Sequence, residues 1–303
     1  MMGISSLGII AQQMVMSLNE AVLSEIQYVG GKSGEGTFYG TSPYLVTFDN
    51  LTGGLQSSPN VGDVFILVVA ASASSTALCD GVGIRGVVDA EIVVETVSLS
   101  ARIIYGVYQS GSVSGLEFSP PAGNVIWFLS VYRGVDLDSP LDITPPDKLS
   151  AINNNSPDYP LILPINDKAR IITVGLASAT GGVDLTAPSG TTLLAARRAT
   201  GGGSSFAGVV ADRVWNSSDG AFDPPGFSGT NSSDSASVGF TIALRPAGAP
   251  ERNNVNVTSV KSYAVFNFNA GNYVSTLKSY AVLNLITTNR VYSLKTYVIL
   301  KAI

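Results

Sequence analysis

The segment ADRVWNSSDGAFDPPGF, residues 211–227, contains the residue types best suited to ligand chemistry. It places three carboxylates beside the rings of Trp215 and Phe222, and amides and hydroxyls lie between them. An aromatic ring can cover the apolar face of a sugar while carboxylates and amides bind its hydroxyls. The segment therefore predicts a glycan-binding surface formed by Trp215, Asp212, Asp219 and Asp223. The alternative is a core tryptophan next to an ordinary loop.

Residue types that carry most hydrolytic and metal chemistry are rare or missing. The chain has no histidine and one cysteine, Cys79. Histidine triads, HExxH zinc sites, cysteine metal clusters and intrachain disulfides are thereby excluded. The GGKSGEG segment lacks the order of a phosphate-binding loop. We expect no catalytic residues, no cofactor and no metal, and we predict that the protein is not an enzyme.

Two chemical alternatives depend on carboxylates. Asp136, Asp138 and Asp142 lie within seven residues, and calcium favours oxygen-rich loops. The glycine and glutamate of an EF-hand loop are missing there, so a solvated loop is the preferred interpretation. A polysaccharide depolymerase that uses a pair of carboxylates is the other alternative, because glycoside cleavage needs two such groups at a defined separation.

The charge pattern argues against nucleic acid and in favour of protein contacts. The net charge is -5, from 17 basic and 22 acidic residues, and no basic cluster occurs. Nucleic-acid binding is therefore not expected. Only 13% of the residues are charged, against about a quarter in ordinary soluble domains. This scarcity predicts that neighbouring proteins cover much of the surface.

No segment is predicted to enter a membrane. The apolar stretch GISSLGIIAQQMVMSLN near the start is interrupted by polar residues and lacks the positive region of a secretory signal. We therefore expect a protein that is made and assembled without export.

The elements that must position these residues are mostly strands. Nine runs rich in Val, Ile, Tyr and Phe alternate with Gly, Ser, Asn and Pro clusters between residues 27 and 246. No amphipathic helix separates them, so the pattern predicts an all-β domain, an antiparallel β-sandwich of jelly-roll or lectin-like type. The runs VFILVVA and VIWFL are apolar on both faces and predict central strands. The proline-rich stretches around residues 135–164 predict long surface loops.

Residues 1–26 predict an N-terminal helix, because apolar residues recur at spacings of three and four from Ile4 to Ile26. The helix could pack on its own domain, or it could form a bundle with copies of itself or a plug into a partner. Its narrow, uncharged stripe favours the second interpretation. At the other end of the β domain, residues 247–256 (AGAPERNNVN) predict a linker.

Residues 257–303 contain three copies of one motif, SVKSYAVFNF, TLKSYAVLNL and SLKTYVIL, with a period of 17. Each copy predicts a strand, and the short turns between them favour an antiparallel meander. A parallel solenoid would stack Lys261, Lys278 and Lys295 on one rung, where like charges repel. The 47 residues are too few for a core of their own, which takes roughly 70 to 80.

The repeats are therefore predicted to be an assembly element. Their predicted contact residues are Tyr263, Phe266, Phe268, Tyr280, Leu283, Leu285 and Tyr297. The repeat segment has five basic residues and no acidic one. Its positive charge would favour docking on the acidic remainder of the chain. The alternative is that the segment simply carries a few solvated lysines.

The pattern GDVFILVVAAS, NVIWFLSVYRGVD, ARIITVGLAS and SVGFTIALRP resembles a β-sandwich of tail-associated and fibre proteins of tailed bacteriophages. The terminal LKSYAVLNL repeats are similar to short elements at the C-termini of such virion proteins. The resemblance covers most of residues 40–303 and rests on short, hydrophobic motifs. It carries over no catalytic residues.

This resemblance implies a structural virion component, usually multimeric, that is assembled in the bacterial cytoplasm. Together with the small size of the repeat segment, it leads us to expect a homotrimer. It implies contacts with other virion proteins and a lectin-like sandwich presented to host-surface glycans. A capsid or neck decoration protein, or a connector, without any ligand is the alternative.

Overall fold

The computed structural model describes residues 23–38, 43–71, 76–78, 84–93, 98–109, 115–119, 123–143, 147–152, 159–181, 184–201, 204–226, 235–249, 260–270, 273–286 and 290–301. The chain divides into two compact units, Met1–Ala249 and Pro250–Ile303. The predicted all-β, antiparallel class is confirmed. Within the described ranges, the only helical element is a single 3-10 turn, η1 (Ser217–Asp219). The predicted N-terminal helix lies outside the described residues, except for residues 23–26, which are not helical.

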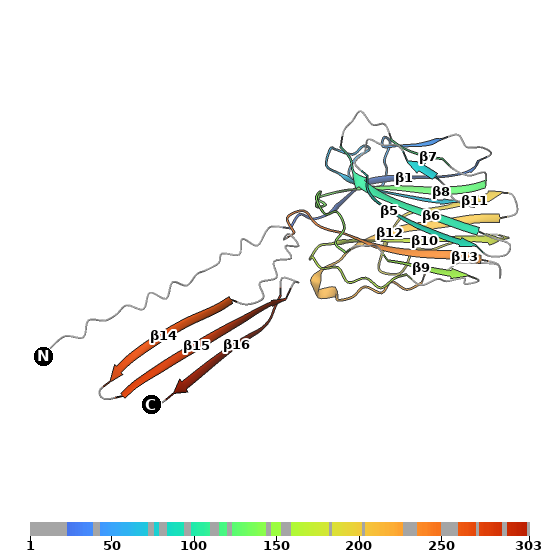
Figure 1. The fold of residues 1–303 in the computed structure, drawn as a ribbon. Coiled ribbons are helices and arrows are strands. Elements are labelled where there is room, and N and C mark those ends of the chain that lie inside the picture. The colour runs from blue at the N-terminus through green and yellow to red at the C-terminus, as the bar shows by residue number, and fades with distance from the viewer. Residues whose placement is uncertain are drawn as a thin grey trace. The chain divides into compact units, whose positions relative to one another are not determined.

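The first unit contains two five-stranded antiparallel sheets (Figure 1). The first sheet has the order β1 (Gln27–Phe38), β8 (Gly123–Arg133), β3 (Val64–Ala71), β6 (Ser98–Val107) and β5 (Ile84–Val93). The second sheet has the order β11 (Thr192–Gly201), β12 (Ser204–Val214), β10 (Arg170–Thr180), β13 (Ser235–Leu244) and β9 (Asp147–Ile152). A small third sheet has the order β2 (Tyr44–Thr47), β7 (Gly115–Ser119) and β4 (Thr76–Leu78).

The largest hydrophobic core lies between the two five-stranded sheets. Alternate residues of each strand point to opposite faces, and the inward set of both sheets meets in one cluster. Phe128 of β8, Leu176 of β10 and Phe240 of β13 are all at most 1% exposed. The predicted central strands are confirmed, because β3 and β8 occupy interior positions of the first sheet and all eight residues of β3 are buried.

The outer faces of the central strands of both five-stranded sheets are also covered. On the first sheet, Phe65 and Trp127 pack with Phe48 and Phe118 beside the small third sheet. On the second sheet, the cover comes from connecting segments, which include Tyr159, Leu185 and Phe222. The predicted surface loops of residues 135–164 are therefore corrected in part. They bury Leu141, Asp142, Tyr159 and Ile162, and they contain the strand β9, which the sequence did not reveal.

The chain completes the first sheet before it begins the second. Every strand of the first sheet and of the small sheet precedes β9, and β9–β13 all belong to the second sheet. In a jelly roll, successive strands pass repeatedly from one sheet to the other. The jelly-roll form of the prediction therefore does not describe the strand order observed here.

The second unit is an antiparallel meander of β14 (Val260–Ala270), β15 (Tyr273–Ile286) and β16 (Arg290–Lys301), as predicted. Its register places Tyr263, Tyr280 and Tyr297 directly opposite one another. The lysines do not face each other across neighbouring strands. Lys261 and Lys295 both pair with Val282, and Lys278 pairs with Val265 and Ile299. The antiparallel arrangement thus avoids the like-charge rung that a solenoid would create.

Gly208 of β12 lies where a side chain would run into the core between the two sheets, which gives a stability test. A Cβ atom there would lie 2.7 Å from Ile126, 2.8 Å from Phe128 and 2.9 Å from Leu176. All three neighbours are fully buried, so Gly208→Val should lower the free energy of unfolding by about 1–3 kcal/mol. Urea unfolding measures this loss. Ala196→Val, at an exposed position of β11, is the control, and equal stability of the two variants would contradict the packing described.

Candidate functional site

The second sheet separates the residues predicted to bind glycan. Trp215 lies on the outer face, packed with Ile162, Ile171 and Ala243. Its ring is 3% exposed, and its Nε1 donates a hydrogen bond to the Gly220 carbonyl over 2.7 Å. Because no face of the ring is free to stack on a sugar, the stacking role predicted for Trp215 is corrected. The alternative interpretation, a core tryptophan, describes this residue.

The three aspartates have different surroundings. Asp212 points toward the first sheet and is fully buried. Asp219 is engaged locally, accepting hydrogen bonds from Arg213 Nη2 over 2.8 Å and from the Asn216 amide over 3.1 Å. Asp223 is exposed. The structure therefore brings none of them together into a surface around Trp215.

Asp212 belongs instead to a buried polar cluster between the two sheets. Arg170, the first residue of β10, donates two hydrogen bonds to its carboxylate, from Nε and Nη2, each over 2.9 Å. The Tyr132 hydroxyl donates a third over 3.3 Å, and the ring of Tyr28 lies 5.6 Å from that of Tyr132. A bidentate pair of this kind fixes both side chains, so the cluster ties β10 and β12 to β8.

Burial dominates the electrostatics of this cluster. It raises the pKa of Asp212, and the ion pair and hydrogen bonds from Arg170 oppose that rise. Burial, aided by the charge of Asp212, raises the pKa of Tyr28 to about 12. The same causes raise the pKa of Tyr132 well above its usual value. The two phenols therefore stay protonated at neutral pH, and Tyr132 donates its hydrogen bond to Asp212 in that state.

A cavity of about 390 Å³ opens beside this cluster, and we name it the Arg170 pocket. It is lined by the start of β1, the loop after β2, the starts of β10 and β11, and the C-terminal end of β12. The lining residues are Tyr28, Gly53, Gly54, Leu55, Arg170, Thr192, Leu193, Leu194 and Asp212. A largely apolar hollow with a few converging polar groups is the usual form of a small-molecule site.

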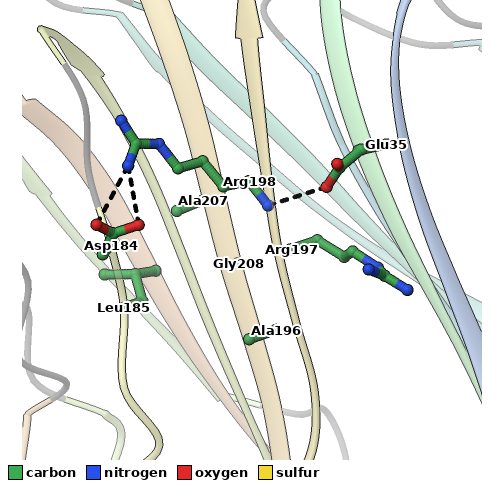
Figure 2. Close-up of a pocket in the computed structure, with 8 residues that line it drawn as sticks. All are labelled: Glu35, Asp184, Leu185, Ala196, Arg197, Arg198, Ala207 and Gly208. Atoms are coloured by element: carbon green, nitrogen blue, oxygen red, sulfur yellow. Dashed lines mark hydrogen bonds and ion pairs between the residues drawn. The ribbon is translucent and has the colours of Figure 1, made fainter.

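A second cavity, of about 350 Å³, lies further along the same edge strands, and we name it the seam pocket (Figure 2). Arg198 is central to it. Its guanidinium contacts both Asp184 oxygens over 3.1 and 3.2 Å, and its amide donates to Glu35 over 3.2 Å. Arg197 reaches Ser33 of β1, its Nε lying 2.9 Å from the hydroxyl oxygen. Two positive and two negative groups thus balance one another, which favours a structural role for this pocket.

Side chains that line the seam pocket bridge two sheet edges. β1 ends the first sheet and β11 ends the second. Arg197 also donates to the Ser33 carbonyl, and Glu35 accepts from the Arg198 amide. These side chains therefore form hydrogen bonds with backbone groups that have no partner strand at the edge of a sheet. Such cover blocks pairing with other chains.

The sequence identified Asp212 but none of its partners. Arg170, Tyr132 and Tyr28 lie 42 residues or more from it along the chain, and no local motif connects them. An acidic residue inside an otherwise apolar strand was the only available signal, because such a residue needs a buried partner.

Removal of the Asp212 charge should be costly. Asp212→Asn would leave the Arg170 guanidinium, whose side chain is only 17% exposed, without a counter-charge; breaking a buried pair in this way typically costs about 3–5 kcal/mol. Denaturant unfolding measures the loss. The control is Asp184→Asn, since the Asp184 carboxylate is 67% exposed in its pair with Arg198, and such pairs contribute about 0–1 kcal/mol. Similar losses in both variants would contradict the buried-pair assignment.

Tyr28 should make stability fall at alkaline pH. Its pKa rises from 10.0 to about 12 on folding, so between these values the unfolded state releases the proton first and the free energy of unfolding decreases as pH rises. Tyr132 and Tyr159 act in the same direction. The test is therefore the difference between the parent protein and Tyr28→Phe, which should show a shallower decline from pH 10 to 12. Identical slopes would show that Tyr28 ionises normally.

Other kinds of site receive no support from the described part of the chain. No group of three or more His, Cys, Asp or Glu side chains there could hold a metal ion. None of the described residues belongs to a helix long and apolar enough to cross a membrane. Comparison with protein-family models, curated proteins and solved structures finds no match to this chain.

Proposed function

We propose that the protein is a structural component of a tailed-phage virion, a fibre or tail-associated protein, and that its two-sheet body is a lectin-like β-sandwich presented to host-surface glycans. The observation that carries the proposal is the separate C-terminal meander of β14–β16. The resemblance of the sequence to fibre proteins supplies the virion setting, and assembly would take place in the bacterial cytoplasm.

The register of the meander gives its two faces different characters. Residues two apart in a strand, and residues paired between strands, share a face. Lys261, Lys278, Lys295 and Lys301 therefore fall on the face of the tyrosine row. The opposite face carries positions such as Ala264, Phe266 and Leu277 and no charged position before the bulge at Asn284. Only one face of the sheet therefore lacks charged positions.

Assembly is the role that suits this sheet. The predicted contact residues all fall in its three strands: Tyr263, Phe266, Phe268, Tyr280, Leu283, Leu285 and Tyr297. Exposure of four large apolar residues would forfeit about 6–12 kcal/mol. In the described strands, β14 and β16 each pair on one side only, and three copies around an axis would close such edges. We therefore propose a homotrimer, with contacts to other virion proteins.

Two other functions remain as alternatives. A decoration or connector protein would use the same assembly sheet and bind no ligand. A depolymerase would need two available carboxylates, and its test is the release of oligosaccharides from host capsule or lipopolysaccharide. No nucleic-acid contact is proposed.

Truncation after Pro250 tests the assembly role. The truncated chain keeps the whole first unit, so it should remain folded and become monomeric in light scattering. In the full chain, Phe266→Lys should weaken the oligomer because it adds a charge to the uncharged face. Lys261→Ala removes a charge from the face of the tyrosine row and adds none to the sheet, so it is the matched control and should leave the oligomer intact. Retention of the oligomeric mass after truncation would contradict the proposal.

A further inference from the structure

The floor of the Arg170 pocket contains hydrogen-bond donors that are not used by other described residues. A guanidinium carries five N–H groups on three nitrogens, and Asp212 engages Nε and Nη2 of Arg170. Neither Nη1 of Arg170 nor the hydroxyl of Tyr28 has a hydrogen-bond partner among the described residues. Both residues line the cavity. The floor therefore suits a ligand that offers an acceptor oxygen.

The rim of the pocket is apolar and held in place. Leu55 is 56% exposed and Leu193 is 54% exposed, and Leu194 packs against the main core. The loop that carries Leu55 is bound to β1 by amide–carbonyl hydrogen bonds, from Leu55 to Tyr28 over 3.3 Å and from Gln56 to Val29 over 3.0 Å. Gly54 lies so close to β1 that a Cβ atom would meet the Val29 carbonyl oxygen at 2.5 Å. The rim is thus fixed and suited to a small apolar group.

The charges of the floor favour a neutral ligand. Arg170 and Asp212 neutralise each other, so an anion would gain from the guanidinium and lose to the carboxylate, and a cation would experience the reverse. Competition for Arg170 would also leave the buried Asp212 without its partner, at a high cost. The volume of about 390 Å³ lies near the lower end of the roughly 300–1,000 Å³ of small-molecule sites, which indicates one sugar-sized ring.

We propose that the Arg170 pocket binds the acetamido group of an N-acetylated hexosamine. The carbonyl oxygen would accept hydrogen bonds from Arg170 Nη1 and Tyr28, and the methyl group would contact Leu55 and Leu193. This inference rests on the proposed glycan-binding function and names its ligand class. It places the site on the opposite side of the second sheet from Trp215.

Titration of the full chain with N-acetylglucosamine and with glucose tests the proposal, because the two sugars differ at the acetamido position. Calorimetry or NMR should show N-acetylglucosamine binding at least tenfold more tightly than glucose. Tyr28→Phe removes one hydrogen bond and keeps the ring, so it should weaken binding about two- to tenfold. Leu193→Ser should also weaken binding. Leu161→Ser is the matched control, because Leu161 is 55% exposed and outside the pocket.

Three results would overturn the assignment. The first is equal affinity for the two sugars. The second is a dissociation constant for N-acetylglucosamine that is weaker than about 10 mM. The third is an unchanged affinity in Tyr28→Phe and Leu193→Ser variants that are still folded. Binding of other host glycans would separate a failure of this site from a failure of the proposed function, since a glycan without N-acetyl groups can still bind elsewhere on the body. The light-scattering test of assembly is independent of all these results.

Discussion

The first unit is organised by one constraint, which is that both faces of its central strands are apolar and must be covered. In β3, Phe65 and Leu67 point to one side while Ile66 and Val68 point to the other, and all four are buried. One sheet cannot satisfy this alone, so the second sheet covers one face and the small third sheet covers the other. The second sheet has the same requirement, and there the connecting segments around Tyr159 and Trp215 provide the cover.

The layers cover the faces of the sheets but leave the backbone groups of their edge strands without a partner strand. β1 and β11 run side by side in the same direction, as the contacts of Ser33 with Arg197 and of Glu35 with Arg198 show. The first part of the β1 edge is paired with the loop at Thr52, whose amide and carbonyl both bond Gly31. Farther along, side chains bridge the two edges. The Arg170 pocket and the seam pocket both lie along this seam, since two edge strands cannot pack as closely as two sheet faces.

Three buried carboxylates of the first unit each have a partner that binds them. Asp212 is paired with Arg170, and Asp63, at the start of β3, forms a bidentate pair with Arg133 at the end of β8. Asp142 accepts hydrogen bonds from the amide and the side chain of Asn166. Each of these carboxylates would be costly to bury alone. The pairs of Asp212 and Asp63 fix the ends of neighbouring strands, and Asp212 also shapes the floor of a pocket.

The sequence by itself determined the all-β class, the central strands and the antiparallel repeat, because each of these depends on local alternation, turn residues and spacing. It did not reveal the short strands β4, β7 and β9, whose few residues carry too weak a pattern. It grouped Asp212 with Trp215 because they are neighbours in the chain. Only the tertiary structure placed them on opposite faces of one sheet, since successive odd and even positions of a strand point apart, and only it joined Asp212 to Arg170, Tyr132 and Tyr28, which come from distant strands.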